Sequence, residues 1–338
     1  MATAETFSCL VVRRNETDEV TAAPESKTID DLPGGEVLIK VEYSSLNYKD
    51  ALACQAHPGV ASDLPHVPGI DAAGVVAKSA DPDFKPGDAV LVTGYDLGTS
   101  HWGGYSRYIR VPASWVVLMP TSLNARDAMI YGTAGFTAAQ CVAAVEHHGI
   151  QPGEGEVLVT GASGGVGSLS VAMLAKLGYT VVAATGKTHQ HDMLTKLGAA
   201  KIIGREQVNN SSDRPLLRAG WSAAVDTVGG NTLSTVLRST QHRGCIAACG
   251  LAGGHDLPLT VYPFILRGVT LAGIDSAKCP RGSRLKIWEH LAKQWRIDYP
   301  QDAVHEIELA DVPVRANEML AGKTSGRTLV KLSRHKDA

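Results

Sequence analysis

The stretch Glu156-Val-Leu-Val-Thr-Gly-Ala-Ser-Gly-Gly-Val-Gly167 decides the fold of this chain. An apolar strand ends at Thr160, a glycine-rich turn follows, and an apolar helical segment begins at Val166. Glycines 164 and 165 let backbone N–H groups approach a pyrophosphate, and the helix N-terminus supplies the positive end of a dipole. A third glycine lets the helix pack closely on the strand. We therefore predict a dinucleotide site, and the residues expected to contact the cofactor are Ser163, Gly164, Gly165, Val166 and Gly167.

Strands and helices alternate after this turn. Further strands are predicted at 180–184, 201–203, 221–226, 245–248 and 269–274, and helices at 166–177 and 188–197. Glycines at 178 and 198 follow the two helices and end them. This β-α-β order predicts an α/β domain with a parallel, doubly wound sheet of the Rossmann type.

The chain before this domain is rich in short strands. They are predicted at 37–43, 72–78, 89–93 and 105–111, and the Gly and Pro turns between them indicate a twisted, barrel-like domain. Two helices are expected at 124–130 and 137–146, with Asn124 and Thr137 as their N-caps. The segment from 304 to 332 is too short to stand alone, and we expect it to fold back onto the first domain. The predicted division is 1–125 with 299–338, and 126–298.

Composition and charge exclude several classes of protein. The 338 residues carry a net charge of −2, with 44% hydrophobic and 20% charged residues, which argues for a globular protein without a broad nucleic-acid surface. The six cysteines form no C-x-x-C pair, and we expect small buried residues rather than a disulfide framework. No stretch of about 18 apolar residues and no signal-like start is seen. We expect a cytoplasmic protein with no membrane and no nucleic-acid partner.

The residues after the strand at 180–184 predict which nicotinamide cofactor is used. An NAD site usually places an acidic residue there to bind the ribose 2′-hydroxyl, whereas this chain has Thr185, Gly186 and Lys187. A hydroxyl, a flexible glycine and a cation suit the 2′-phosphate of NADPH. Arg205, just after the next strand, is a second candidate cation. The alternative for both cations is an ordinary solvated loop charge.

Eight blocks occur in one order along almost the whole chain. They are Ser45-Leu-Asn-Tyr-Lys-Asp-Ala-Leu52, Val67-Pro-Gly-Ile-Asp71, His101-Trp-Gly-Gly104, Gly132-Thr-Ala-Gly-Phe-Thr-Ala138, Val159-Thr-Gly-Ala-Ser-Gly-Gly-Val-Gly167, Cys249-Gly-Leu-Ala-Gly253, Pro263-Phe-Ile-Leu-Arg267 and Gly326-Arg-Thr-Leu-Val-Lys331. Together they resemble the zinc-free, quinone oxidoreductase-like branch of the medium-chain dehydrogenase/reductase superfamily, and within it the YhdH/YhfP-type acrylyl-CoA reductase group. The resemblance implies a GroES-like β-rich catalytic domain beside the Rossmann domain.

The same resemblance implies that no metal is used. Zinc-dependent members carry a cysteine in the first domain and then Gly-His-Glu, and here these positions hold Asn47, Ile70 and Asp71. The four-cysteine structural zinc lobe is also missing. The histidine pairs 57/66 and 147/148 have no cysteine or carboxylate at ligand spacing. We therefore expect no metal site.

The activity implied by the resemblance is NADPH-dependent reduction of the C=C bond of acryloyl-CoA. Such a reaction needs a group that stabilises an enolate and a group that delivers a proton. Tyr48 is our first candidate proton donor, with Asn47 to orient substrate or cofactor and Tyr95 as a second aromatic candidate. The alternatives are that Asn47 holds a tight turn with Asp50, that Tyr48 only packs on the nicotinamide, and that Tyr95 only walls the pocket.

Further cofactor contacts are expected where other strands end. The residues predicted to line the nicotinamide are Cys249, Gly250, Leu251, Ile274 and Ser276, with the Cys249 thiol packing rather than reacting. Arg327 is expected to face the cleft and to meet a phosphate or carboxylate. A basic cluster, Lys278, Arg281, Arg284 and Lys286, is either a CoA contact or a solvated face.

The sequence leaves two alternative functions undecided, and it also raises the question of self-association. The first rival is an NADPH:quinone or enone oxidoreductase with a planar small-molecule substrate and no CoA. The second is a redox sensor that binds NADPH without turnover, although a binder needs no proton donor at Tyr48. By analogy with relatives we also expect a homodimer joined along the strand at 268–274.

Overall fold

The computed structural model describes residues 6–332, which form two compact units. Of the described residues, unit 1 comprises 6–133, 277–289 and 304–332, and unit 2 comprises 134–276 and 290–303. The predicted division instead assigns 277–289 to the cofactor domain. The structure places this segment in unit 1 because its backbone and Arg284 bond to the loop after residue 93: Tyr95 N donates to Ala277 O at 2.9 Å, and Arg284 donates to Thr93 O at 2.6 Å.

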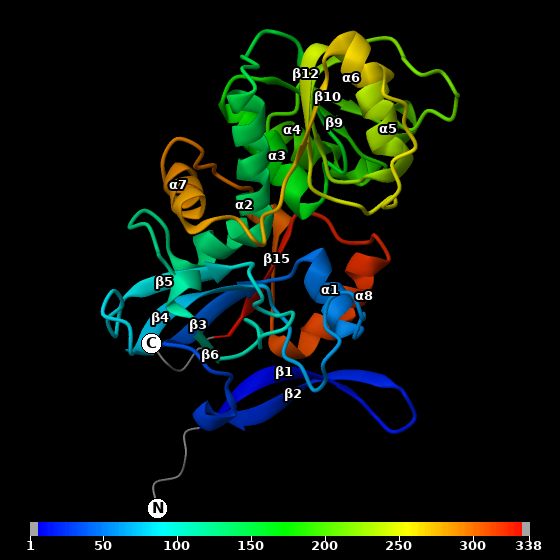
Figure 1. Ribbon diagram of the computed structural model, residues 1–338. Coiled ribbons are helices and arrows are strands. Elements are labelled where there is room, and N and C mark those ends of the chain that lie inside the picture. The colour runs from blue at the N-terminus through cyan, green and yellow to red at the C-terminus, as the bar shows by residue number, and fades with distance from the viewer. Residues whose placement is uncertain (1–5, 333–338) are drawn as a thin grey trace, which may run out of the picture. The chain divides into compact units, whose positions relative to one another are not determined.

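Unit 1 is built mainly on antiparallel strands, with one parallel pair formed by its last two strands (Figure 1). Its strands are β1 (Thr6–Arg14), β2 (Val20–Thr28), β3 (Val37–Ser45), β4 (Asp71–Ser79), β5 (Ala89–Thr93), β6 (Tyr108–Val111), β7 (Val117–Leu118), β14 (Val304–Ile307) and β15 (Arg327–Lys331). Strands β1 and β2 form a separate hairpin, and the larger sheet has the order β14-β15-β3-β4-β5-β7, with β6 paired to β3. The C-terminal segment therefore joins the first domain, as predicted, because β15 pairs with β3.

Apolar side chains alternate along the strands of unit 1 and fill its core. Val37, Ile39 and Val41 of β3 are buried with Val90 and Val92 of β5. The helices α1 (Tyr48–Cys54) and α8 (Val312–Leu320) pack on each other, and α7 (Arg281–Ala292) continues past the end of this unit. A period-2 pattern of this kind buries one face of each strand.

Unit 2 contains the parallel sheet that the sequence predicts. Its strands are β8 (Glu156–Val159), β9 (Thr180–Ala184), β10 (Lys201–Ile203), β11 (Trp221–Asp226), β12 (Thr240–Ala248) and β13 (Thr270–Gly273). Its helices are α3 (Gly165–Lys176), α4 (His191–Lys196), α5 (Gly230–Arg238) and α6 (Tyr262–Arg267). The strand order β10-β9-β8-β11-β12-β13 reverses direction between β8 and β11. In doubly wound sheets ligands bind at this reversal, outside the carboxyl ends of the strands.

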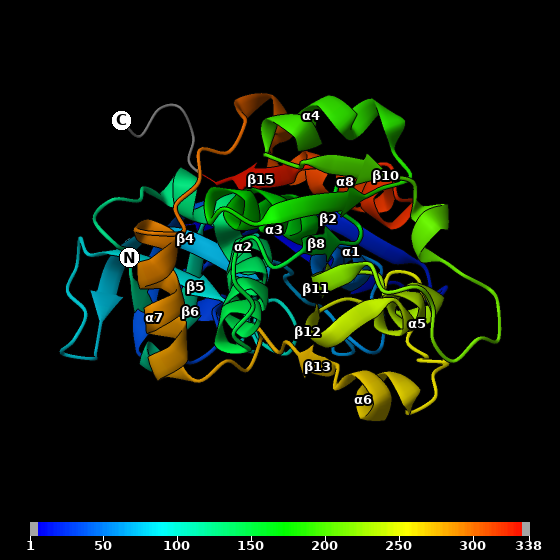
Figure 2. The ribbon, with the colours of Figure 1, turned by 90° about the horizontal axis from the view of Figure 1, so that it is seen from above.

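The helices of unit 2 cover both faces of its sheet. Helix α3 contacts β8 and β9, α4 contacts β10, and α5 and α6 contact β12. Right-handed crossovers require the first pair and the second pair to lie on opposite faces. Figure 2 shows α4 beside the β10 end of the row of strands and α6 beside the β13 end. The core includes Leu158, Val182, Ala224 and Ile246, which lie in adjacent strands.

Helix α2 (Ala125–His147) consists of two helical halves, which confirms the prediction of two helices in this segment. The halves meet at a kink at Gly132, whose φ is 49° and ψ is −153°, so the second half begins earlier than predicted. Asn124 caps its start, as predicted, because its side chain accepts from Asp127 N at 2.8 Å. The predicted cap at Thr137 is wrong, since Thr137 lies inside the helix. Among the described residues α2 alone is long and apolar enough to cross a membrane, but 78% of its apolar window is buried, as in a core helix.

Candidate functional site

The glycine-rich turn joins β8 to α3 at the reversal of the sheet. Gly164 is the N-cap residue, and the first intrahelical bond runs from Ser168 N to Gly164 O at 2.9 Å. No side chain among the described residues caps this helix. The N–H groups of Gly165, Val166 and Gly167 precede that first bond, so they have no partner inside the helix. N–H groups in this position are suited to an anion such as a pyrophosphate, as the sequence predicts.

Gly167 is fixed by packing. A Cβ placed on it would lie 2.8 Å from Ala162 Cα and closer still to Gly161 O. Both neighbours are backbone atoms of the same turn, so no side chain can move aside. The turn therefore keeps its shape only with glycine at 167, as the sequence predicts for close helix–strand packing.

The residues predicted to select the cofactor come together at the ends of β9 and β10. Ser163 Oγ and Thr185 Oγ1 share a hydrogen bond of 3.0 Å, and Lys187 N donates to Thr185 Oγ1 at 3.1 Å. The side chain of Arg205 runs past Gly186, where an added Cβ would lie 3.1 Å from its Cδ and 3.2 Å from its Nε. Lys187 and Arg205 thus border one loop with no acidic residue in it.

The predicted nicotinamide wall lies at the ends of β12 and β13. Cys249 N donates to Asp226 O at 2.9 Å, which places this turn against the end of β11. A Cβ on Gly250 would lie 2.7 Å from Thr227 C, so only glycine allows this approach. Ile274 N donates to Ala248 O at 3.0 Å. Leu251 is exposed, and Ile274 and Ser276 are half-buried. All these residues follow the carboxyl ends of parallel strands.

One polar group at the sheet reversal was not predicted. Asp226 ends β11, is fully buried, and accepts from Thr160 Oγ1 and from Gly229 N, each at 2.7 Å. Thr227 Oγ1 donates back to Thr160 O at 3.0 Å. Burial raises the pKa of Asp226, and the hydrogen bonds oppose this. Its position could have been predicted from the sequence. Asp226 ends the predicted strand 221–226, and the carboxyl ends of parallel strands lie at the same edge of the sheet as the glycine-rich turn.

In unit 1, the predicted catalytic segment forms the start of α1. Asn47 is the N-cap residue, and its backbone N–H donates to Asp50 Oδ2 at 2.9 Å. Its side-chain Nδ2 donates to Asp71 Oδ2 at 2.8 Å. Asp50 Oδ1 accepts from Ile70 N at 2.8 Å. These contacts match the alternative that Asn47 and Asp50 hold a tight turn.

Asp71 is the centre of a buried polar cluster. Its carboxylate accepts from Ser45 Oγ at 2.6 Å, from Thr133 Oγ1 at 2.6 Å and from Thr133 N at 2.9 Å, besides the Asn47 amide. Because Thr133 N bonds to Asp71, it does not continue the helix from Met129, and α2 breaks at Gly132. The Asp71 carboxylate therefore causes the break in α2 and also satisfies the N–H group that the break leaves free.

The carboxyl of Asp50 is fully buried in the same cluster. Burial, and then the nearby carboxylate of Asp71, raise its pKa to about 7, while hydrogen bonds from Asn47 and Ile70 oppose the shift. At neutral pH a substantial fraction of this group therefore carries a proton.

Tyr48 differs from its neighbours in α1 because it is exposed. Its side chain is 46% exposed, and residues 6–332 provide no hydrogen-bond partner for its hydroxyl. A phenol in this position is able to donate a proton to a ligand, whereas the amide of Asn47 is already bonded to two carboxylates. The catalytic role of each residue stays a prediction.

Tyr95 is held from both sides. Its ring stacks on Trp115, with centroids 5.5 Å apart and planes at 5°, and the Arg284 guanidinium lies 4.2 Å from its centroid. Its backbone has a φ of 53°. A ring fixed in this way suits the wall of a pocket.

Arg327 is buried in unit 1. Its Nε donates to Ile130 O at 2.7 Å and its Nη2 to Met129 O at 3.3 Å. These are carbonyls that the break at Gly132 leaves without helical partners, and Arg327 satisfies them. A cofactor contact through Arg327 stays a prediction.

The predicted basic cluster is not one solvated face. Arg281 donates to Ser114 O and Val116 O, and Arg284 is fully buried under Tyr95. Lys278 is exposed and pairs with Asp96, and Lys286 is exposed on α7. Over residues 6–332 no group of three or more His, Cys, Asp or Glu side chains is placed to hold a metal ion.

Two sequence families match this architecture. Residues 33–121 match the alcohol dehydrogenase GroES-like domain, and residues 165–291 match the family described as zinc-binding dehydrogenase. The first lies in unit 1 and the second begins at the start of α3. With the sheets described above, they confirm the predicted fold class of a GroES-like domain and a Rossmann domain.

Three relatives resemble the chain over nearly its whole length. It is 47% identical over 97% of its length to the acrylyl-CoA reductase AcuI of Ruegeria pomeroyi, of which it covers 99%. It is 45% identical to the YhdH oxidoreductase of Salmonella enterica, solved in complex with NADP, with a TM-score of 0.92 over 96% of this chain and 100% of that one. YhfP of Bacillus subtilis, named as a quinone oxidoreductase, is 45% identical over 96% of this chain and 99% of that one. A structure of YhfP with NAD bound has a TM-score of 0.94 over 97% of this chain and 100% of that one.

Proposed function

The chain belongs to the zinc-free, quinone oxidoreductase-like branch of the medium-chain dehydrogenase/reductase superfamily, and we propose that it reduces the C=C bond of acryloyl-CoA, or of a similar small enoyl thioester, with NADPH. The observation that carries this proposal is the similarity to an acrylyl-CoA reductase over 97% of this chain and 99% of that one. The phosphate turn and the exposed Tyr48 are the parts that such a reaction requires.

The residues of unit 2 fit NADPH. The free N–H groups at the start of α3 suit its pyrophosphate, and only glycine fits at position 167. Lys187 and Arg205 border a loop without an acid, which suits a 2′-phosphate better than a 2′-hydroxyl. Lys187 lacks the bidentate fork of an arginine, so we assign it charge rather than directional recognition.

In this proposal the bound cofactor supplies a hydride for the β-carbon of the thioester. The chain must then stabilise negative charge on the thioester oxygen and protonate the α-carbon. Tyr48 is assigned the proton because its hydroxyl is exposed and unbonded within the described part of the chain. Asn47 is assigned to hold the start of α1, and thereby Tyr48, in place through Asp50 and Asp71.

The test compares substrates under one set of conditions. NADPH oxidation is followed by absorbance with acryloyl-CoA, with benzoquinone and with a simple enone. We expect kcat/KM for acryloyl-CoA to exceed kcat/KM for benzoquinone and for the enone by at least about 10²-fold. A difference of this size is larger than the loss of a single small apolar contact would produce. Fast turnover of benzoquinone with no turnover of acryloyl-CoA would contradict the proposal.

The second candidate is an NADPH:quinone or enone oxidoreductase. The name of the similar YhfP protein favours it. The same turn and the same proton donor would serve, so the substrate comparison above decides between the two. A third outcome, NADPH binding without turnover of any acceptor, would indicate the redox-sensor alternative.

We also infer a homodimer formed through unit 2. Strand β13 ends the six-stranded sheet, and within the described residues its outer edge has no strand partner. Beside it, α6 exposes Val261, Tyr262, Ile265 and Leu266, at 62%, 44%, 67% and 55%. An open strand edge beside an apolar patch suits a second copy of the chain. Light scattering should give twice 35.6 kDa, and Ile265→Glu should give the monomer mass.

We place the protein in the cytoplasm. All six cysteines lie in the described part of the chain, none is paired, and five are buried. Unpaired thiols are typical of a reducing compartment. Cell fractionation checks this placement, and recovery with secreted or membrane material would contradict it.

A further inference from the structure

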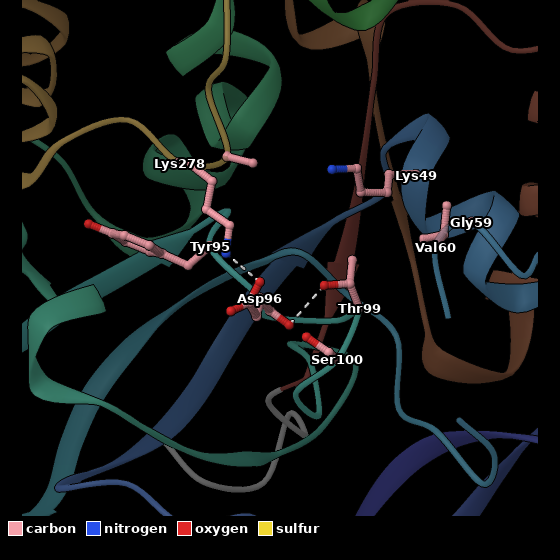
Figure 3. Close-up of a pocket in the computed structure, with 9 residues that line it drawn as sticks. Lys49, Gly59, Val60, Tyr95, Asp96, Thr99, Ser100 and Lys278 are labelled. Carbon is pink, nitrogen blue, oxygen red and sulfur yellow. Dashed lines mark hydrogen bonds and ion pairs between the residues drawn. The ribbon is translucent and has the colours of Figure 1, made fainter. Parts of the chain in front are cut away.

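A polar pocket in unit 1 is not used by the mechanism above (Figure 3). It has a volume of about 240 Å³ and lies among the start of α1, the loop after β5 and the segment before α7. The lining residues that bear on its chemistry are Lys49, Tyr95, Asp96, Thr99, Ser100 and Lys278. All of them belong to unit 1, so the pocket is a feature of this unit alone.

The pocket carries excess positive charge. Lys49 and Lys278 contribute two ammonium groups, whereas Asp96 contributes one carboxylate. Lys278 Nζ lies 2.5 Å from Asp96 Oδ1, and both side chains remain about half exposed, at 58% and 44%. Lys49 is exposed and has no ion pair among residues 6–332. The net charge of this lining is therefore +1, and the unmatched charge is that of Lys49.

The loop after β5 adds one hydroxyl donor to these cations. Asp96 O accepts from Thr99 N, Thr99 Oγ1 and His101 N, at 3.2, 3.0 and 3.0 Å, which closes a tight turn and uses the proton of the Thr99 hydroxyl. Figure 3 shows Ser100 on this turn, below the two lysines. Two ammonium groups with the adjacent Ser100 hydroxyl are donors of the kind that a phosphate oxygen binds.

The position of the pocket relates it to the substrate. Lys49 directly follows Tyr48 in α1, and Tyr95 contributes a fixed aromatic wall. The basic residues first expected to meet CoA are not available here, because Arg281 and Arg284 bond to backbone carbonyls. Of that cluster only Lys278 lines the pocket, where it is joined by Lys49.

We propose that this pocket binds a phosphate group of the coenzyme A moiety, with Lys49 and Lys278 as the phosphate-binding cations and Asp96 as a carboxylate that pairs with Lys278 in the free enzyme and competes with the phosphate for it. The inference rests on the proposed function, because it assigns a subsite to the same substrate. The pocket also distinguishes the two candidate substrates, because a CoA thioester carries phosphate groups that it could bind and a quinone carries none.

The test varies the carrier and the pocket together. Steady-state rates are measured for acryloyl-CoA, acryloyl-dephospho-CoA and acryloyl-pantetheine with the wild type, Lys49→Met and Lys278→Met. Each Lys→Met change should reduce the ratio of kcat/KM for acryloyl-CoA to that for acryloyl-pantetheine by about tenfold, the effect of one charge-assisted hydrogen bond. If dephospho-CoA behaves like CoA, the diphosphate is bound. If it behaves like pantetheine, the bound group is the 3′-phosphate.

Two further variants separate binding from general damage. Lys78→Met removes an exposed charge from β4 that does not line the pocket, and should leave the ratio at its wild-type value. Asp96→Asn removes the competing carboxylate and should raise the ratio several-fold, a change of sign that misfolding does not produce. Equal ratios in the wild type and all variants would overturn the subsite, whereas a wild type that reduces no acryloyl thioester would overturn the proposed function instead.

Discussion

Gly167→Ala should damage the cofactor site through its backbone. The added methyl group would lie 2.8 Å from Ala162 Cα and from Gly161 C, and closer still to Gly161 O. An ordinary contact of this kind is about 3.4 Å or more, so the turn must open by roughly 1 Å. The N–H groups to which we assign the pyrophosphate belong to the same turn, so they move with it.

Two magnitudes follow from this displacement. Overpacking against backbone atoms costs about 3 kcal/mol, at the upper end of the usual range, because no side chain can rotate away. In a unit of this size that lowers Tm by about 6–12 °C. A shift of about 1 Å in a set of aligned donors lowers cofactor affinity by about 10²-fold.

The assay is paired with a matched control. NADPH binding is measured by fluorescence titration and Tm by calorimetry for Gly167→Ala and for Gly220→Ala, which makes the same chemical change in unit 2. A methyl group added at Gly220 would meet no heavy atom within 4 Å, and the backbone φ there is not in the left-handed range. The control should keep wild-type affinity and a Tm within about 2 °C. If Gly167→Ala binds NADPH as tightly as the control does, our account of the turn is wrong.

Three further changes test the remaining assignments. Lys187→Ala should raise KM for NADPH about tenfold or more and leave KM for NADH nearly unchanged; equal changes would remove the 2′-phosphate assignment. Tyr48→Phe should lower kcat by about 10²-fold at an unchanged Tm, and a normal rate would place the proton donor elsewhere. Because the pKa of Asp50 is raised to about 7, the folded state binds a proton that the unfolded state loses near pH 4, so the unfolding free energy should fall between about pH 4 and pH 7. Asp50→Asn should flatten that slope, and an unaltered slope would show that another group causes it.

Local rules predicted the cofactor unit well. The strand, turn and helix around Gly164 follow from backbone geometry and helix N-terminal chemistry, which act within a dozen residues. The antiparallel hairpin of β1 and β2 was not predicted, because β2 carries Pro24 and charged side chains that hide its alternation. Helix α1 was also missed, since its seven residues are too few for a helical period.

The candidate site was predicted less fully because its buried polar groups depend on long-range contacts. Asp71 meets Thr133 across 62 positions of the chain, and Arg327 meets Ile130 across 197. No local pattern indicates that a carboxylate will interrupt one helix or that an arginine will satisfy the carbonyls left by the break. The sequence therefore indicated the segments in which the candidate site residues lie, whereas the hydrogen-bond partners of Asn47, Arg284 and Arg327 depend on the fold.

The buried cluster around Asp71 also bears on how freely this scaffold exchanges its chemistry. Asn47, Ile70 and Asp71 stand where zinc-dependent members of the superfamily carry ligands. In this chain each of them anchors backbone: Asn47 caps α1, Ile70 N bonds to Asp50, and Asp71 ends one half of α2 and begins the next. A cysteine at 47 would remove the amide that bonds to Asp50 and Asp71, and a glutamate at 71 would displace the carboxylate that bonds to Thr133. A histidine at 70 would keep the bond to Asp50, because that bond comes from the main-chain N–H. Grafting a zinc site here would therefore disturb the supports of two helices through positions 47 and 71. The hydrogen-bonded carboxylate of Asp71 thus has a structural role at the position of a metal ligand, and a single substitution would not convert this cluster into a zinc site.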